Sequence, residues 1–385
     1  MNPVRCSITM LAAVAVLGAC TENDPDSGSA DKAISVVSTD DECTTSAATA
    51  GSGNLVFDVK NDGSDVTEFY LLADDGLRII GEVENIGPGL TRRLVVTAAP
   101  GDYFTACKPG MVGEGIRAAF NVTDSGDSGQ PTGDLAELLT TATDQYGAYV
   151  RDQAGQLITK TEQFAALYAA GDDDGARALY ADARTHWERI EPVAESFGDL
   201  DPRLDLREAD LAEGEAWTGW HRIEKDLWPE GDPAYTAATD AERTELADQL
   251  VADTQELVTR VKDLTFTPDQ LGNGAKELLD EVATGKVTGE EEIWSHTDLW
   301  DFQANVDGAR IAFEVLQPAL ETKDKALSTT LTTRFATLQQ LLDQYRSGDG
   351  FVLYTDLTED QVKGLSDAVN ALSEPLSELT AAVVL

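Results

Sequence analysis

The chain has 385 residues, of which 42% are hydrophobic, and this is enough for two domains that each bury a core. Its 70 acidic and 28 basic residues give a formal net charge of −42, which argues against nucleic acid as a partner because phosphate backbones attract basic surfaces. The charge favours cations only diffusely, since an acidic, solvated surface accounts for most of it.

Residues 1–20 have the composition of an export signal that ends in a lipid-anchored cysteine. Arg5 precedes an apolar run at residues 8–17, which is too short to span a bilayer. The run ends in Leu-Gly-Ala-Cys, and small residues before a cysteine suit the cleft of a lipoprotein signal peptidase. We expect residues 1–19 to be removed and Cys20 to carry acyl chains, which anchors the chain at the outer face of a membrane (cell surface or periplasmic face). The alternative is an ordinary secretory signal with an incidental cysteine.

Two segments of different composition follow. Residues 20–40 are rich in Asp, Ser, Gly and Ala, which is typical of a flexible tether. In residues 41–123, Leu55, Phe57 and Val59 alternate with polar positions, and further short apolar runs are separated by turn signals. This pattern predicts a small β-sandwich. No later segment is long and apolar enough for a membrane helix.

The predicted β-sandwich contains two cysteines and no histidine. In an oxidising compartment, Cys43 and Cys107 are expected to form a disulfide. Because a blue copper centre needs two imidazoles, that kind of site is excluded. Glu68, Asp102 and Met111 could form a looser second metal site; the favoured alternative is a disulfide with no metal in this region.

From residue 134 onward, after a linker at residues 124–133, the hydrophobic period changes to that of a helix. Breakers such as Pro229 and Pro268 separate the amphipathic segments. This predicts an all-helical bundle domain over residues 134–385. The predicted helices are residues 134–170, 173–198, 206–228, 240–264, 267–286, 296–321, 325–347 and 358–382.

All three histidines lie in the helical region. His221 and Glu224 fall one turn apart on an aromatic face of the predicted helix 206–228. Burial of Glu224 there is costly without a partner, and a bound cation would provide one. His186 lies on an apolar face of the second helix, and His296 lies one turn before the apolar face of the sixth. The alternative is that each histidine is a hydrogen-bonded core residue.

Several acidic residues lie near these histidines. Glu191 follows the second helix, a run of three glutamates that includes Glu291 precedes His296, and Asp301 lies in the sixth helix. Histidine and carboxylate on bundle helices can build an iron site, but this pattern does not choose between iron, zinc and copper. Glu188 is expected to face solvent.

Three segments of the helical region resemble the EfeO group of iron-uptake proteins in the imelysin-like family. They are residues 186–195 (HWERIEPVAE), the motif G-x-H-x-x-E at residues 219–224, and residues 295–308 (SHTDLWDFQANVDG). Residues 84–89 and 100–103 are similar to the cupredoxin-like module of its longer members. The resemblance covers nearly the whole mature chain.

The resemblance implies a cupredoxin-like β-sandwich followed by two packed four-helix bundles. It also implies an extracytoplasmic iron-binding role beside a membrane permease and a haem-containing peroxidase. By matching, His221 and Glu224 are the first choice as metal ligands, followed by Glu191, Glu291, His296 and Asp301. The β module could bind copper or ferric iron through Glu68 and Asp102.

A zinc peptidase at the cell surface is the alternative function, because the imelysin-like family also carries a peptidase label. A zincin needs the motif H-E-x-x-H, but Arg222 follows His221 where its glutamate would stand. The reversed motif fails as well, since Lys225 follows Glu224. The sequence therefore predicts a binding protein rather than an enzyme. A purely structural surface protein would leave the histidine faces unexplained.

Overall fold

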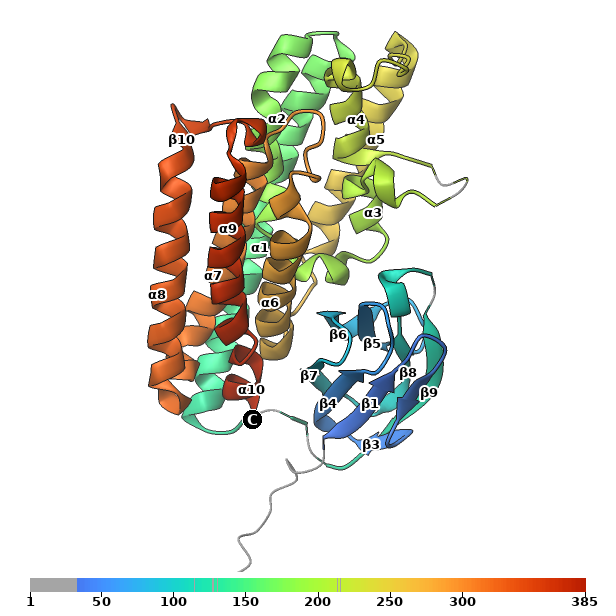
Figure 1. Ribbon diagram of the computed structural model, residues 1–385, viewed down its shortest axis with the longest axis vertical. Coiled ribbons are helices and arrows are strands. Elements are labelled where there is room, and N and C mark those ends of the chain that lie inside the picture. The colour runs from blue at the N-terminus through green and yellow to red at the C-terminus, as the bar shows by residue number, and fades with distance from the viewer. Residues whose placement is uncertain (1–32, 114, 127, 130, 213, 215) are drawn as a thin grey trace, which may run out of the picture. The chain divides into compact units, whose positions relative to one another are not determined.

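The computed structural model describes residues 33–385 except 114, 127, 130, 213 and 215 (Figure 1). The predicted signal peptide, Cys20 and most of the predicted tether lie outside the described residues. In the part of the chain that is described, no helix has the length and apolar character needed to cross a membrane.

The N-terminal β module consists of two sheets, with strand orders β2-β1-β4-β7 and β3-β9-β8-β5-β6. The first strand lies inside the range predicted to be a tether, so the β module begins before residue 41. It joins the sheet because it pairs in parallel with β4. The strands are β1 Ile34–Ser38, β2 Cys43–Thr45, β3 Thr49–Gly51, β4 Gly53–Asn61, β5 Thr67–Leu72, β6 Ile79–Ile86, β7 Thr91–Ala98, β8 Gly101–Cys107 and β9 Ile116–Thr123.

Alternating apolar residues form the core of this module. Leu55, Phe57 and Val59 of β4 are buried, as predicted, and the ring of Phe57 packs against Phe69 and Phe120 of the other sheet. The predicted disulfide joins Cys43 of β2 to Cys107 of β8, so it links the two sheets covalently.

The predicted all-helical domain follows, with a short hairpin of β10 (Arg346–Ser347) and β11 (Gly350–Phe351) between its last helices. Helices α1, α2, α4 and α5 contact one another in a ring, and α6, α7, α8 and α9 form a second ring, which gives two four-helix bundles. The helices are α1 Asp134–Ala169, α2 Asp173–Glu188, α3 Leu200–Asp205, α4 Gly219–Leu227, α5 Asp240–Arg260, α6 Pro268–Thr284, α7 Asp298–Lys323, α8 Lys325–Leu342, α9 Glu359–Leu376 and α10 Leu379–Val384.

Several predicted helices are shorter than expected, and two of them differ most. The predicted helix 206–228 forms only as α4, because Gly219 has a φ of 86° and lies against the Leu204 carbonyl, where a Cβ would come within 2.1 Å of the oxygen. The predicted helix 173–198 ends at Glu188, and the 3-10 segment η2 (Glu191–Phe197) follows. Pro192 accounts for this break, since proline cannot continue a helix.

Helix α6 connects the β module to the helical domain. Its first turn is fixed to β7, because the backbone N–H of Thr97 donates to Asp269 and the side chain of Asn273 donates to the Val95 carbonyl, each at 2.9 Å. Figure 1 shows α6 beside the edge strands β6 and β7, which α6 contacts. Residues of β6 and α6 can therefore contribute to the same site.

Candidate metal centre

The G-x-H-x-x-E motif lies on α4 and is fully buried. His221 Nδ1 is 3.4 Å from Glu224 Oε2, so the i, i+3 spacing brings the two side chains together as predicted. The other oxygen of Glu224 accepts the backbone N–H groups of Trp294 and Ser295, at 3.1 and 2.7 Å. These bonds fix the carboxylate beside the imidazole.

Further carboxylates lie on both sides of the His221 ring. On one side, Nε2 is 3.4 Å from Asp205 and 3.5 Å from Glu291. On the other, Nδ1 is 4.0 Å from Glu292. Two groups of three potential ligands result, Asp205 with His221 and Glu291, and His221 with Glu224 and Glu292, each with ligand atoms within 4.8 Å of one another. Mixed nitrogen and oxygen donors of this kind suit iron and zinc.

A buried arginine neutralises part of this cluster. The guanidinium of Arg184, on α2, is completely buried and forms ion pairs with five carboxylates. The distance from its Nε to Glu292 is 2.7 Å. Its partners are Glu188, Asp205, Glu291, Glu292 and Asp301.

Lys286 provides a second buried cation. Its Nζ lies 3.0 Å from Glu188, 2.8 Å from Glu191 and 3.7 Å from Glu291. Asn305 of α7 donates to both Glu188 and Glu191. This pair of contacts holds Glu191 at the edge of the cluster, away from His221.

Acidic groups outnumber cations in the cluster. Burial and the charge of Arg184 lower the pKa of His221, but the effects of Asp205, Glu224 and Glu291 are larger. The net result is a pKa raised to about 9, so the ring is cationic at neutral pH. Together with Arg184 and Lys286 this gives three cations against six carboxylates, those of Glu188, Asp205, Glu224, Glu291, Glu292 and Asp301. The excess carboxylates must take up protons or a metal ion.

Several buried polar atoms of the cluster lack hydrogen-bond partners among the described residues. Those on candidate ligands are Nε2 of His221 and both carboxylate oxygens of Asp301. Burial raises the pKa of Asp301 well above its usual range, although Arg184 opposes the shift. Unpaired buried polar atoms are costly, and a cation with available coordination positions would satisfy them.

The structure separates the six predicted ligands into three groups. His221, Glu224 and Glu291 lie together, with Asp301 beside them through Arg184. Glu191 is bound to Lys286 instead. His296 has a left-handed backbone with φ of 60° and bonds through its main chain to Glu292 and Tyr354. It belongs to none of the groups of potential ligands found among the described residues.

Four charged residues of the cluster were missed or misassigned. Arg184, Asp205 and Lys286 were not predicted, and the expectation that Glu188 faces solvent is wrong, since its side chain is completely buried. The i, i+4 spacing of Arg184 and Glu188 on the face of α2 that also carries buried Ala183 and Trp187 is the signal that could have identified them.

The residues proposed for a second metal site in the β module do not come together. Glu68 precedes Phe69, which pairs with Cys107 at the end of β8, whereas Asp102 lies near the start of the same strand. Asp102 is six residues from Lys108, whose backbone N–H donates to the Glu68 carbonyl. At about 3.3 Å per residue, the two positions are therefore roughly 20 Å apart. Glu68 accepts a hydrogen bond from Tyr70 and lies near Lys108, and Met111 is partly exposed.

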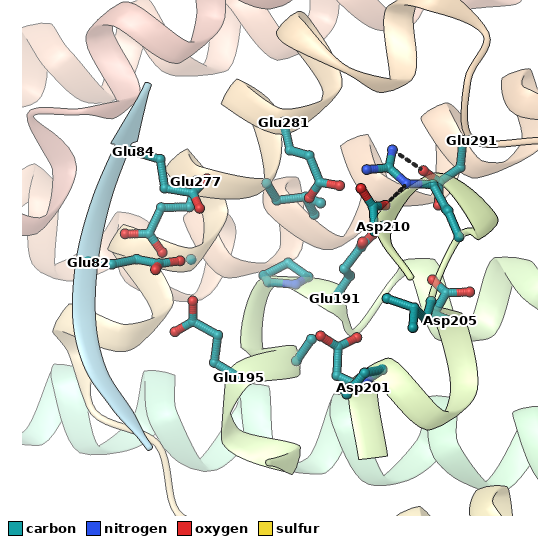
Figure 2. A pocket seen from close by; sticks show the side chains of 17 residues that line it. Glu82, Glu84, Glu191, Glu195, Asp201, Asp205, Asp210, Glu277, Glu281 and Glu291 are labelled. Carbon is teal, nitrogen blue, oxygen red and sulfur yellow. Dashed lines mark hydrogen bonds and ion pairs between the residues drawn. The ribbon is translucent and has the colours of Figure 1, made fainter. Parts of the chain in front are cut away.

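An acidic cavity of about 270 Å³ extends from the His221 cluster to the β module. Figure 2 shows Asp205 and Glu291 at one end and Glu82, Glu195 and Glu277 at the other. Ten acidic side chains line it, together with Arg207, which forms ion pairs with Asp210, Glu290 and Glu291. His221 itself does not line the cavity, but its neighbours Asp205 and Glu291 do.

Sequence comparisons agree with this architecture. A family model described as imelysin matches residues 142–379. The iron uptake system component EfeO of Yersinia pestis is 37% identical over 349 residues, 90% of each chain. An Efem/EfeO family lipoprotein of Staphylococcus haemolyticus is 45% identical over 250 residues, 64% of this chain and 85% of that protein. The chain therefore belongs to the imelysin family. Within it, the chain groups with the EfeO and Efem lipoproteins, which confirms the resemblance inferred from the motifs.

Proposed function

We propose that this protein is the extracytoplasmic metal-binding component of an iron-import system, which captures iron and passes it to a membrane permease. The observation that carries the proposal is the buried cluster around His221, in which carboxylates exceed the available cations. The names of its relatives, iron uptake system components, support the same role. The resemblance adds a haem-containing peroxidase as a further partner. The signal sequence predicts a lipid on Cys20 as the anchor, and the lipoprotein relative supports an extracytoplasmic location.

His221, Glu224, Glu291 and either Asp205 or Glu292 are the ligands we propose for the transported ion. Their donor set fits ferrous or ferric iron, and also zinc or copper. Binding at His221 requires the neutral imidazole, so the ion must displace a proton. Arg184 occupies the same carboxylates, and we infer that it keeps the cluster folded when no ion is bound.

A surface zinc peptidase is the competing function, favoured only by the peptidase label of the family model. Peptide cleavage would require a metal with room for a substrate. His221 is 1% exposed and does not line the cavity. The general-base position of the motif H-E-x-x-H is Arg222, which bonds to Tyr235, and the second histidine position of the reversed motif is Lys225, which bonds to Glu208. This geometry favours binding over hydrolysis.

Iron binding by His221→Ala and Glu224→Gln distinguishes these functions. We expect the affinity to fall at least about 10–100-fold, the loss typical of removing even a supporting group of a metal site. His186→Gln is the matched control, because His186 is also buried but bonds to Gln153 outside the cluster. Unchanged iron binding in both site variants would refute the proposal, and metal-dependent peptide cleavage by the unmodified protein would support the peptidase.

Replacement of Cys20 separates binding from transport. Without its anchor, the Cys20→Ala protein should bind iron with unchanged affinity while cellular iron uptake falls, because the carrier diffuses away from the permease. Full uptake by a Cys20→Ala protein found in the medium would contradict the anchored-carrier mechanism.

A further inference from the structure

The other end of the acidic cavity contains three carboxylates from three different elements. Glu82 lies on β6, Glu195 on η2 and Glu277 on α6. One oxygen from each lies within 4.8 Å of the others, and Figure 2 shows the three side chains converging from separate parts of the fold. We call this group the Glu82 triad.

Close packing of the backbone brings these elements together. A Cβ on Gly274 would lie 1.8 Å from the Pro192 carbonyl oxygen, so only glycine lets α6 approach η2 this closely. Glu277 and Glu195 each follow this contact by three residues. The bonds from Thr97 to Asp269 and from Asn273 to Val95 bring the β module to the same helix. The contacts among η2, α6 and the β module therefore hold the three glutamates close together.

The triad differs from the His221 cluster because its carboxylates have no ion-pair partner among the described residues. Glu82 is 6% exposed, and its Oε2 is buried with no hydrogen-bond partner. None of the Lys or Arg side chains in the described residues forms an ion pair with Glu82, Glu195 or Glu277; the neighbouring Lys276 is paired with Asp280 instead. A buried carboxylate without a partner is expensive, so the pocket must hold either protons or a cation.

We propose that Glu82, Glu195 and Glu277 form a second metal site, specific for a hard cation that prefers oxygen ligands, at the junction of the β module and the helical domain. Carboxylates with no nitrogen or sulfur donor favour such ions over zinc or copper(I). Three carboxylates match the charge of a trivalent ion. The identification of that ion as ferric iron rests on the proposed function, but the site itself does not.

Neighbouring acidic groups support this assignment. Glu84 and Glu281 line the same cavity, so additional oxygen ligands are available beside the triad. The metal-free alternative is a proton shared between Glu82 and Glu195.

Terbium(III) binding by the full chain tests the second site, because this ion is trivalent, prefers oxygen and has no redox chemistry at neutral pH. Glu82→Gln and Glu277→Gln should each weaken its binding about 10–100-fold. Glu374→Gln, which removes the same charge from an exposed position of α9, should have no effect. Crystals soaked in terbium(III) should show an anomalous peak between the three carboxylates. Ferric nitrilotriacetate should compete for the site, and zinc should not.

The results also separate this site from the His221 cluster. His221→Ala should leave terbium binding intact, so loss of iron transport in that variant would not affect the second site. Equal binding by Glu82→Gln, Glu277→Gln and Glu374→Gln would overturn the inference. So would the absence of bound ion together with higher melting temperatures for both triad variants, since that result identifies a shared proton.

Discussion

Replacement of Arg184 by methionine should make the stability of the helical domain depend on metal. The guanidinium is completely buried and contacts five carboxylates. Removal of one partner from a buried ion pair typically costs about 3–5 kcal/mol, which is a large share of the roughly 5–15 kcal/mol that keeps a domain folded. The metal-free variant should therefore be folded but much less stable.

A bound cation should restore most of that loss. In the Arg184→Met protein, the carboxylates of Asp205, Glu291 and Glu292 no longer have a competing cation, so an ion should bind more tightly than in the unmodified chain. At a hundredfold excess over its Kd, a ligand adds about 2.7 kcal/mol to the folded state. The increase in stability on adding iron should be larger in the variant than in the unmodified protein.

Urea unfolding followed by circular dichroism, with and without ferrous iron under anaerobic conditions, measures both effects. Arg260→Met is the matched control, because the ion pairs of Arg260 with Asp199 and Glu256 are substantially exposed and should contribute at most about 1 kcal/mol. This prediction is refuted if Arg184→Met lowers the stability no more than Arg260→Met does, or if iron leaves the stability of Arg184→Met unchanged. Either result would mean that Arg184 does not neutralise the carboxylates that bind the ion.

Three further predictions follow from other parts of the fold. Burial, followed by the charges of Arg189 and Lys160, lowers the pKa of His186 to about 4. Because its pKa in the unfolded chain is about 6.5, the contribution of His186 to the free energy of unfolding is complete above pH 6.5 and is lost as the pH falls towards 4. His186→Gln should remove up to about 3 kcal/mol of that pH dependence in unfolding titrations, and identical slopes would contradict the assignment. Cys43→Ser with Cys107→Ser should destabilise the β module by about 4 kcal/mol, since the disulfide closes a 64-residue separation; an unchanged melting temperature would exclude this role. Gly219→Ala should lower the stability by at least about 1 kcal/mol and weaken iron binding, because Gly219 has a positive φ and contacts Leu204. The control Gly364→Ala on α9, where an added Cβ meets no atom within 4 Å, should stabilise the chain by up to about 1 kcal/mol.

The sequence predicts the architecture well because hydrophobic periodicity records local burial. Alternation at Leu55, Phe57 and Val59 identifies β4, and the boundaries predicted for the long helices agree with α1, α5 and α8 at their first residues. The pairing of Cys43 with Cys107 follows from the expected oxidising compartment and from the presence of only two cysteines after Cys20 in the sequence. The predicted start of a helix is wrong where a single backbone contact determines it. At Gly219, the close approach to Leu204 ends the preceding loop, and α4 begins there.

The metal centre could be predicted only in part because its partners are distant in sequence. His221 and Glu224 share one helical turn, so spacing alone brings them together. Three other segments supply Arg184, Asp205 and Glu291. The sequence does not distinguish a charged side chain that is buried in an ion pair from one that is exposed to solvent. Glu188 illustrates this, since its burial depends on Lys286 nearly a hundred residues away.

The two proposed sites explain why a β module accompanies a helical domain that already contains a histidine cluster. Glu68 and Asp102 lie far apart, so the module does not assemble the independent site expected of it, but through β6 it supplies Glu82 to the cavity. No Lys or Arg in the described part of the chain forms an ion pair with the Glu82 triad, whereas the His221 cluster is paired with Arg184 and Lys286. A cation at the triad therefore binds carboxylates that have no ion-pair partner, whereas at Asp205 and Glu291 it competes with Arg184 and Lys286. On this account Glu82→Gln should slow iron loading of the His221 cluster without changing its final affinity. Stopped-flow measurement of iron uptake would show this, and an unchanged rate would mean that ions reach His221 by another route.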